Sequence, residues 1–288
     1  MNHTQRIPTL DLSTARRADA VRIFGQGLER FGFVIVVNHG VDTDLLTRAY
    51  DVSQRTFALP VETKRAYETP DNGRDTGYTS FGIEHAKDDE RVDLKEFWHV
   101  RRSVPADRLL FPKEIPDFAQ VIMSLYGALD GVAAGLLDLL DDHLGTTPGH
   151  FAGMVKDGNS LLRMLHYPPI VGNPDGMRSA PHEDINFITL LVAATASGLQ
   201  VKTRDGEWIA VDNPPNAIIV NSGDMLKAFT EGRIPSTTHR VVNGDGSGAR
   251  YSIPFFVHPR TEVQLTPELT AGQYLRKRLI EIGLIKED

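Results

Sequence analysis

His182 and Asp184, a histidine and an aspartate separated by one residue, are a pair whose types and spacing could do chemistry. On an extended chain, side chains two residues apart point to the same side, so the pair could hold one metal ion from one strand end. A third ligand is then expected from a neighbouring strand, and His239, at the start of another apolar stretch, is the candidate. Two histidines and one carboxylate on one face of an ion form the ligand set of non-haem Fe(II) oxygenases.

The same residues permit a second interpretation, which is a surface His-Asp pair and an unrelated core histidine. Triplets of this kind arise by chance in a chain of this composition. Glu183, between the two, would face away from them on an extended chain and is not expected to be a ligand. The metal hypothesis therefore depends on the surrounding sequence.

Arg250 and Ser252 form a second pair at this spacing, eleven residues after His239 and at the start of a further apolar stretch. An arginine offers a planar fork of donors that matches a carboxylate, and a serine adds a hydroxyl donor beside it. Alone, the pair would be an exposed arginine on an ordinary strand. Beside a candidate iron centre, it indicates an anchor for the distal carboxylate of a dicarboxylate co-substrate.

Composition limits the class of protein. The chain has 288 residues, of which 41% are hydrophobic and 24% charged, as is usual for a soluble globular protein. It has no cysteine, which excludes disulfides and thiolate metal sites. The net charge of −7 argues against nucleic acid as a partner, because phosphate binding needs a basic surface. We find no signal-peptide pattern and no run of 18 apolar residues, so we expect a cytoplasmic protein that does not bind membranes; the oligomeric state is not predicted.

Helical patterns dominate the first part of the chain. Residues 18–31 and 45–57 carry helical apolar spacing, with a short β-rich run at 33–37 between them. A long core helix is expected over residues 118–144, because apolar residues recur every three or four positions and Gly145 follows.

Short strands with turn signals dominate after residue 158. They are expected at 161–167, 185–193, 199–202, 208–211, 217–220, 239–242 and 250–257. This pattern is typical of a sandwich or barrel. The predicted class is α+β with a mainly β core, in which a mostly helical region (1–157) packs on the β core (158–260) and a C-terminal helix (261–288) completes one structural unit.

The sequence resembles, over nearly its whole length, the isopenicillin N synthase-like family of Fe(II)/2-oxoglutarate-dependent dioxygenases, as a bacterial-type member. RIPTLDLS and RFGFVIVVNHGV are similar to the N-terminal region of that family, and LLRMLHYPP to the strand leading to its active site. HEDINFITLL and HRVVNGDGSGARYSIPFF are similar to its two metal segments.

This resemblance implies a distorted double-stranded β-helix, or jelly roll, in which His182, Asp184 and His239 are the catalytic iron ligands. Arg250 and Ser252 would bind 2-oxoglutarate, assisted by Tyr167. The implied cofactors are Fe(II), 2-oxoglutarate and O2, and the implied reaction oxidises, most often hydroxylates, a C–H bond of a small molecule and releases succinate and CO2. The sequence departs from plant members at Leu165, where they have asparagine, so one polar contact near the co-substrate is missing or comes from elsewhere.

The substrate itself is not identified by the sequence. In the family, the segment before the long helix helps to cover the mouth of the barrel. In this sequence that segment is residues 73–99. The candidate substrate residues are Tyr78, Phe81, His85, Phe97, Phe187 and Phe256. The same segment also carries Lys87, Lys95, Glu96, Trp98 and His99. An ordinary solvated loop with packing aromatics would have a similar composition.

Two other functions remain open at this point. One is an Fe(II) oxidase of the isopenicillin N synthase type, which needs no 2-oxoglutarate and uses its Arg-x-Ser for another anion. The other is a non-catalytic jelly-roll binding protein.

Overall fold

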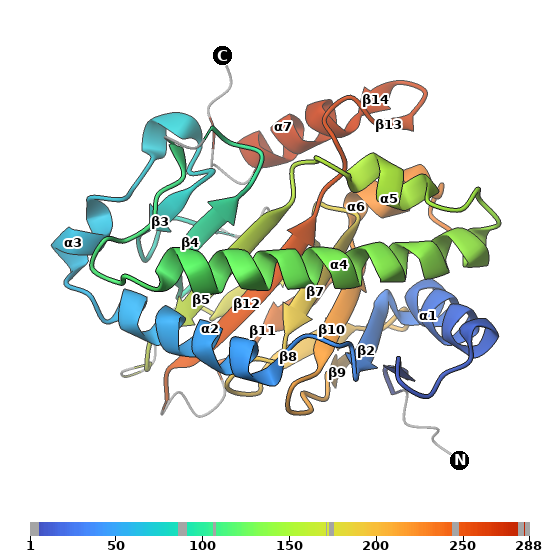
Figure 1. The fold of residues 1–288 in the computed structure, drawn as a ribbon, viewed down its shortest axis with the longest axis horizontal. Coiled ribbons are helices and arrows are strands. Elements are labelled where there is room, and N and C mark those ends of the chain that lie inside the picture. Colours follow the sequence, from blue (N-terminus) through green and yellow to red (C-terminus); the bar gives the residue numbers. More distant parts are fainter. Residues whose placement is uncertain are drawn as a thin grey trace.

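The computed structural model describes residues 6–85, 91–105, 108–170, 172, 176–243, 248–281 and 285, and it contains a major and a minor β-sheet (Figure 1). The major sheet has eight strands in the order β1-β2-β10-β7-β12-β5-β4-β3. Their bounds are β1 Thr9–Asp11, β2 Phe33–Val37, β3 Gly77–Thr79, β4 Glu96–Arg101, β5 Leu161–Tyr167, β7 Ile188–Val192, β10 Ile218–Ser222 and β12 Arg250–Val257. Apart from the parallel pair β1 and β2, neighbouring strands are antiparallel.

The minor sheet has the order β6-β11-β8-β9 and is also antiparallel. Its strands are β6 Ser179–His182, β8 Leu199–Lys202, β9 Trp208–Ala210 and β11 His239–Val241. A separate hairpin joins β13 Gln264–Thr266 to β14 Leu269–Thr270. Residues of both larger sheets line a common cavity, so the two sheets form an open jelly roll and not a closed barrel.

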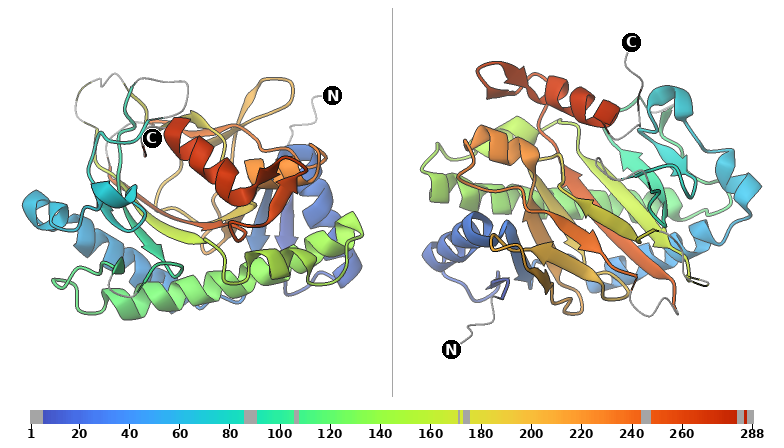
Figure 2. Two further views of the ribbon diagram at one scale, coloured as in Figure 1. Left: turned by 90° about the horizontal axis from the view of Figure 1, so that it is seen from above. Right: turned by 180° about the vertical axis from the view of Figure 1, so that it is seen from behind.

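Helices cover the outer face of the major sheet. Figure 1 shows α4 (Phe118–Leu144) crossing the strands, with α1 (Arg17–Phe31) and α2 (Thr43–Phe57) beside it. By length and mean hydropathy α4 could cross a membrane, but its apolar residues are part of the main core with the sheet, as expected of a core helix. The remaining helices are α3 Val61–Arg65, the 3₁₀ turn Pro70–Asn72, α5 His150–Val155, α6 Asp224–Phe229 and α7 Ala271–Glu281. Seen from above, α7 lies on the side of the sheet opposite to α4 (Figure 2).

The α+β class, the jelly-roll core and the long helix predicted from the sequence are confirmed. The sequence pattern predicted no strand in residues 73–99, but β3 and β4 lie there and extend the major sheet beyond β5. Strand alternation then gives the segment two faces. Trp98 and Tyr78 are buried in the core beneath α4. On the opposite face of β4, His99 lies beside Arg163 of β5 and Arg101 lies beside Leu161.

A buried ion pair joins α3 to β4. Lys64 Nζ lies 2.8 Å from Glu96 Oε2, and both side chains are more than nine-tenths buried. Glu96 also accepts hydrogen bonds from the Tyr78 hydroxyl and, at 2.7 Å, from His166 Nδ1. Burial opposes ionisation of Glu96, but these donors and Lys64 lower its pKa below the usual value. Glu96, considered above as part of a substrate cover, therefore has a structural role, and so does His166, which stacks on Tyr251.

Replacing Lys64 by Met is expected to lower the free energy of unfolding by about 3–5 kcal/mol, because the Glu96 charge would stay buried without its partner. Denaturant titration measures this loss. Arg65→Met is the matched control, since Arg65 is half exposed and its pair with Glu62 contributes little. Equal, small effects of the two substitutions would contradict the role given to Lys64.

Candidate metal centre and substrate cavity

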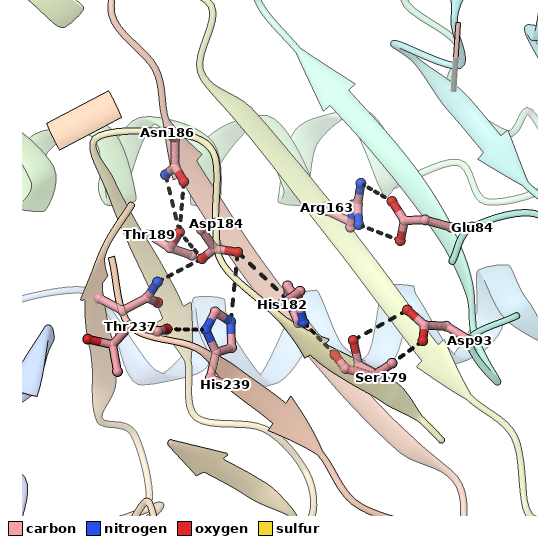
Figure 3. Close-up of polar contacts among 12 residues, drawn as sticks. Glu84, Asp93, Arg163, Ser179, His182, Asp184, Asn186, Thr189, Thr237 and His239 are labelled. Atoms are coloured by element: carbon pink, nitrogen blue, oxygen red, sulfur yellow. Dashed lines mark hydrogen bonds and ion pairs between the residues drawn. The ribbon is translucent and has the colours of Figure 1, made fainter. Parts of the chain in front are cut away.

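His182, Asp184 and His239 converge on one point in the structure (Figure 3). One ligand atom from each lies within 4.8 Å of the other two. Asp184 Oδ1 is 3.9 Å from His182 Nε2 and 3.8 Å from His239 Nε2. His182 and His239 are also direct partners across β6 and β11, which fixes the spacing of the two imidazoles.

Both imidazoles are oriented by backbone carbonyls. His182 Nδ1 lies 2.8 Å from the Ala180 oxygen, and His239 Nδ1 lies 3.1 Å from the Thr237 oxygen. A carbonyl only accepts, so each Nδ1 carries the proton and each Nε2 lone pair faces Asp184. Burial and the neighbouring His239 lower the pKa of His182 to about 4, which keeps it the neutral imidazole that a metal requires.

The sequence predicts that strand alternation sets the direction of the Asp184 side chain. In the structure, Asp184 lies in the loop after β6 and not on a strand, so alternation does not set this direction. Other contacts hold it. Its Oδ2 accepts hydrogen bonds from Thr189 Oγ1 at 2.5 Å and Asn221 Nδ2 at 2.8 Å, which leaves Oδ1 for the metal. Burial opposes the charge on Asp184, but His239, His182 and these donors lower its pKa below the usual value.

The start of α6 supports this loop from behind. The Asp224 amide donates to the Asp184 carbonyl at 2.7 Å, and the Gly223 amide donates to the Phe187 carbonyl at 2.9 Å. A Cβ at Gly223 would lie 2.3 Å from the Asn186 oxygen, so glycine allows this close approach. These supporting residues carry no metal-ligand spacing, and sequence reasoning missed them.

The residues present fit an Fe(II) centre. Two imidazole nitrogens and one carboxylate oxygen face a common point from one side, which is the facial arrangement of non-haem iron oxygenases. Among the described residues, this is the one cluster of histidine and acidic side chains that could hold a metal. Glu183 is outside it, as expected, and accepts a hydrogen bond from the Thr238 hydroxyl.

The cavity that both sheets line is called the inner cavity here. On one side it ends at Arg250. Arg250 is 2% exposed, and its Nη1 is buried without a hydrogen-bond partner among the described residues. The guanidinium stacks 5.1 Å from the centre of the Tyr167 ring, which lies opposite it on β5. The Ser252 and Tyr167 hydroxyls also line the inner cavity and form no hydrogen bond with another described residue. A buried cation with unused donors beside a metal site fits the distal carboxylate of 2-oxoglutarate.

Leu165 also lines the inner cavity, where it is the cross-strand partner of Ser252. It packs with Phe97 and Tyr167 in a small apolar cluster. The polar contact that plant members have here is therefore replaced by apolar packing among these side chains.

A second space, the outer cavity, lies on the other side of the triad and has a volume of about 170 Å³. It shares His182, Asp184, Lys95, Arg163 and Phe256 with the inner cavity. Its other lining residues are Glu84, His85, Asp93, Arg101, Leu161, Pro181, Glu183, Ile185, Asn186, His258, Leu275 and Arg278.

Buried charged side chains line the outer cavity beside the triad, and Figure 3 shows three of them, Glu84, Asp93 and Arg163. Arg163 donates from both Nη atoms to the Glu84 carboxylate at 3.1 Å, and Lys95 lies 2.6 Å from Glu84 and 2.7 Å from Asp93. Asp93 accepts in turn from the Ala180 amide at 2.8 Å. The network thus ties Glu84, Asp93 and Lys95 to β6, the strand that ends at His182.

The candidate substrate residues fall into two groups. His85 and Phe256 line the outer cavity. Tyr78, Phe97 and Phe187 do not reach it: Tyr78 and Phe187 are buried in the main core on the helix side, and Phe97 packs behind Leu165. Phe81 is 46% exposed and also lies outside both cavities. Lys87 lies outside the described residues.

The fold and the site together define a non-haem iron oxygenase centre with a separate anchor for a carboxylate. Comparisons with known proteins agree. A family model described as 2OG-Fe(II) oxygenase superfamily matches residues 158–259, and one described as non-haem dioxygenase in morphine synthesis N-terminal matches residues 7–118. The chain is 30% identical to the 2-oxoglutarate-Fe(II) type oxidoreductase hxnY of Emericella nidulans, over 86% of this chain and 78% of the relative.

Solved structures show the same fold. A 2OG-Fe(II) oxygenase family protein from Caulobacter crescentus has 36% identity and a TM-score of 0.85, with coverage of 97% of this chain and 100% of that chain. A full-length protein of Neurospora crassa in complex with alpha-KG has 25% identity and a TM-score of 0.85, with 97% of each chain covered. The chain belongs to the 2OG-Fe(II) oxygenase superfamily. It is a dioxygenase that uses Fe(II), 2-oxoglutarate and O2.

Asp184→Ala is expected to abolish turnover and to weaken iron binding sharply, because it removes one of three protein ligands and its charge. Iron content after dialysis against Fe(II) measures the second effect. Glu183→Ala removes the neighbouring carboxylate and should retain iron. Full iron content in Asp184→Ala would reject this ligand set.

Arg250→Lys keeps the positive charge but loses the planar fork, so 2-oxoglutarate binding should weaken by about 1.5–3 kcal/mol while iron content stays unchanged. Anaerobic titration of the Fe(II) protein with 2-oxoglutarate gives the affinity. Arg240→Lys is the control, because Arg240 stacks on Trp208 away from both cavities. A normal 2-oxoglutarate affinity in Arg250→Lys would assign the anchor to another residue.

Proposed function

We propose that this dioxygenase hydroxylates a C–H bond of a small molecule that binds in the outer cavity. One observation carries the proposal: the inner and outer cavities meet at His182 and Asp184. The co-substrate and a second molecule can then lie on either side of the same metal site without competing for space.

The bound Fe(II), with 2-oxoglutarate and O2, supplies oxidative decarboxylation to succinate and CO2 and the oxidation of a nearby C–H bond. The protein binds and orients the reactants. Arg250, Ser252 and Tyr167 hold the distal end of 2-oxoglutarate, and the Glu84–Arg163–Lys95 network fixes the wall that positions the second molecule.

The size and chemistry of the outer cavity support a small substrate. Its volume of about 170 Å³ suits a compact molecule, and its lining mixes apolar with charged side chains. The net charge of −7 disfavours a nucleic acid. The similar Neurospora crassa protein was also solved with alpha-KG and thymine, which is a small molecule.

The test uses the Fe(II) protein, 2-oxoglutarate and ¹⁸O₂ with a small-molecule fraction of a cell extract. We expect substrate-dependent formation of succinate, and a product that is one oxygen atom heavier and carries the label. Mass spectrometry of the fraction before and after reaction measures both. A product that has only lost two hydrogens would show desaturation instead, and oxidation confined to added protein or nucleic acid would contradict a small-molecule substrate.

A further inference from the structure

Arg101 forms the far end of the outer cavity. It is the last residue of β4 and pairs with Leu161 on β5, which in turn pairs with Phe256 on β12. Arg250 lies six residues before Phe256 on β12. At the rise of a strand, the two arginines therefore lie at levels roughly 20 Å apart along the sheet.

Most other charges in the outer cavity have partners. Glu84 and Asp93 contact Lys95, and Arg163 contacts Glu84. Arg278 lies 2.7 Å from Glu281 and 3.6 Å from Asp224.

Arg101 differs from these side chains. Its Nη1 donates to the Asn159 side-chain oxygen at 2.5 Å, and its Nε is buried without a hydrogen-bond partner. No carboxylate of the described residues lies within 4.0 Å of it. Asp75 attracts it from further away but is itself bound to Arg108 at 2.7 Å.

A guanidinium whose Nε is buried without a hydrogen-bond partner is costly, because that group has lost water without gaining an acceptor. Burial lowers the pKa of Arg101, although Asp75 acts in the opposite direction. Bound 2-oxoglutarate uses the opposite end of the space, at Arg250. A second anion at Arg101 would thus compensate this charge without displacing the co-substrate.

We propose that Arg101 binds a carboxylate group of the primary substrate, at the end of the outer cavity away from Arg250. This rests on the proposed function, because it takes the outer cavity as the substrate site. Leu161, Ile185, Phe256 and Leu275 line the same space and contact an apolar body. The substrate class is therefore a monocarboxylic acid with an apolar body, whose far end reaches the metal site.

His258, also in this wall, does not replace Arg101. Its Nδ1 lies 3.3 Å from the Phe256 carbonyl oxygen, so Nδ1 carries the proton and Nε2 is an acceptor. Burial and the neighbouring Arg101 lower the pKa of His258 to about 3. The neutral ring thus adds no positive charge, and Arg101 is the group that selects an anion.

The test measures binding to the anaerobic Fe(II)–2-oxoglutarate complex of the full chain, without turnover. The probes are phenylacetate, 3-phenylpropionate and hexanoate, each paired with its primary amide, which has nearly the same shape and no charge. We expect at least one acid to bind about tenfold to a hundredfold more tightly than its amide, the range of a charged hydrogen bond. Binding of the amides as tightly as the acids, or no binding of any acid, would overturn the proposal.

Three variants assign the preference to Arg101. Arg101→Gln should remove the preference for the acid, and Arg101→Lys should restore part of it. Arg102→Gln changes the same charge on the adjacent, half-exposed residue, which contacts Tyr126 and lies outside both cavities, and should keep the full preference. The visible charge-transfer band of the Fe(II)–2-oxoglutarate complex shows that each variant is folded with an intact metal site.

An acid preference that persists in Arg101→Gln would contradict the proposal. The binding test of Arg101 and the oxidation test of the proposed function can fail independently. If small-molecule oxidation is found but acids and amides bind alike, only the role of Arg101 fails. If Arg101 selects acids but no small molecule is oxidised, the proposed reaction fails and the binding site stands.

Discussion

The pairing register of β5 and β12 is the constraint on which the site depends. Arg250 lies opposite Tyr167, Ser252 opposite Leu165, and Phe256 opposite Leu161. Because side chains alternate across a strand, all six face the same side of the sheet. A shift by one residue would turn Arg250 and Ser252 toward α2 and α4 and place Tyr251 and Ile253 in the cavity. The proposed co-substrate anchor, the apolar floor and the proposed substrate wall thus follow from a single register.

The buried charges along the inner and outer cavities are paired in the middle and, within the part of the chain that the structure describes, lack an anionic partner at the two ends. In the middle, Arg163, Glu84, Lys95 and Asp93 compensate one another and hold β4, β5 and β6 together. At the ends, Arg250 and Arg101 keep donors without an anionic partner among the described residues. Since a buried ion without a partner is costly, the two arginines occupy the positions at which we propose that ligands supply the anions.

Much of the fold could be predicted from local pattern. The predicted bounds of the helix at 118–144 and of the strands at 161–167 and 250–257 match the structure, because apolar residues dominate each stretch and turn residues flank it. The strand β4 was missed because it faces two different environments. Trp98 and Val100 enter the apolar core, whereas on the opposite face His99 bonds to Arg163 and Arg101 lines the outer cavity, so the polar positions interrupt the apolar pattern of a strand. The strand β6 is short and contains Pro181, which weakens any strand signal.

The metal ligands could be predicted because His239, the Arg250–Ser252 pair and the family resemblance supported the His182–Asp184 spacing, but the residues that hold Asp184 in place could not. Asp184 is held by Thr189, Asn221 and the start of α6, which are contacts between distant parts of the chain. Of the candidate substrate residues, His85 and Phe256 line the outer cavity, whereas Tyr78, Phe81, Phe97 and Phe187 lie outside it for a related reason. An aromatic residue near a metal segment can face the core or the cavity, and only the pairing of its strand decides which.

Leu165 shows how this enzyme divides its polar and apolar contacts. Where plant members of the resembling family have asparagine, the leucine packs on Phe97 and Tyr167 and forms an apolar floor between the two arginines. An asparagine there would need hydrogen-bond partners that Phe97 cannot provide, because β4 presents an aromatic ring at this level. The polar groups that contact ligands are therefore concentrated at the metal and at the two ends. This arrangement orients a molecule with an acidic end and an apolar body more strictly than a uniformly polar cavity would, because only one direction places its charge at Arg101 and its carbon atoms beside the metal.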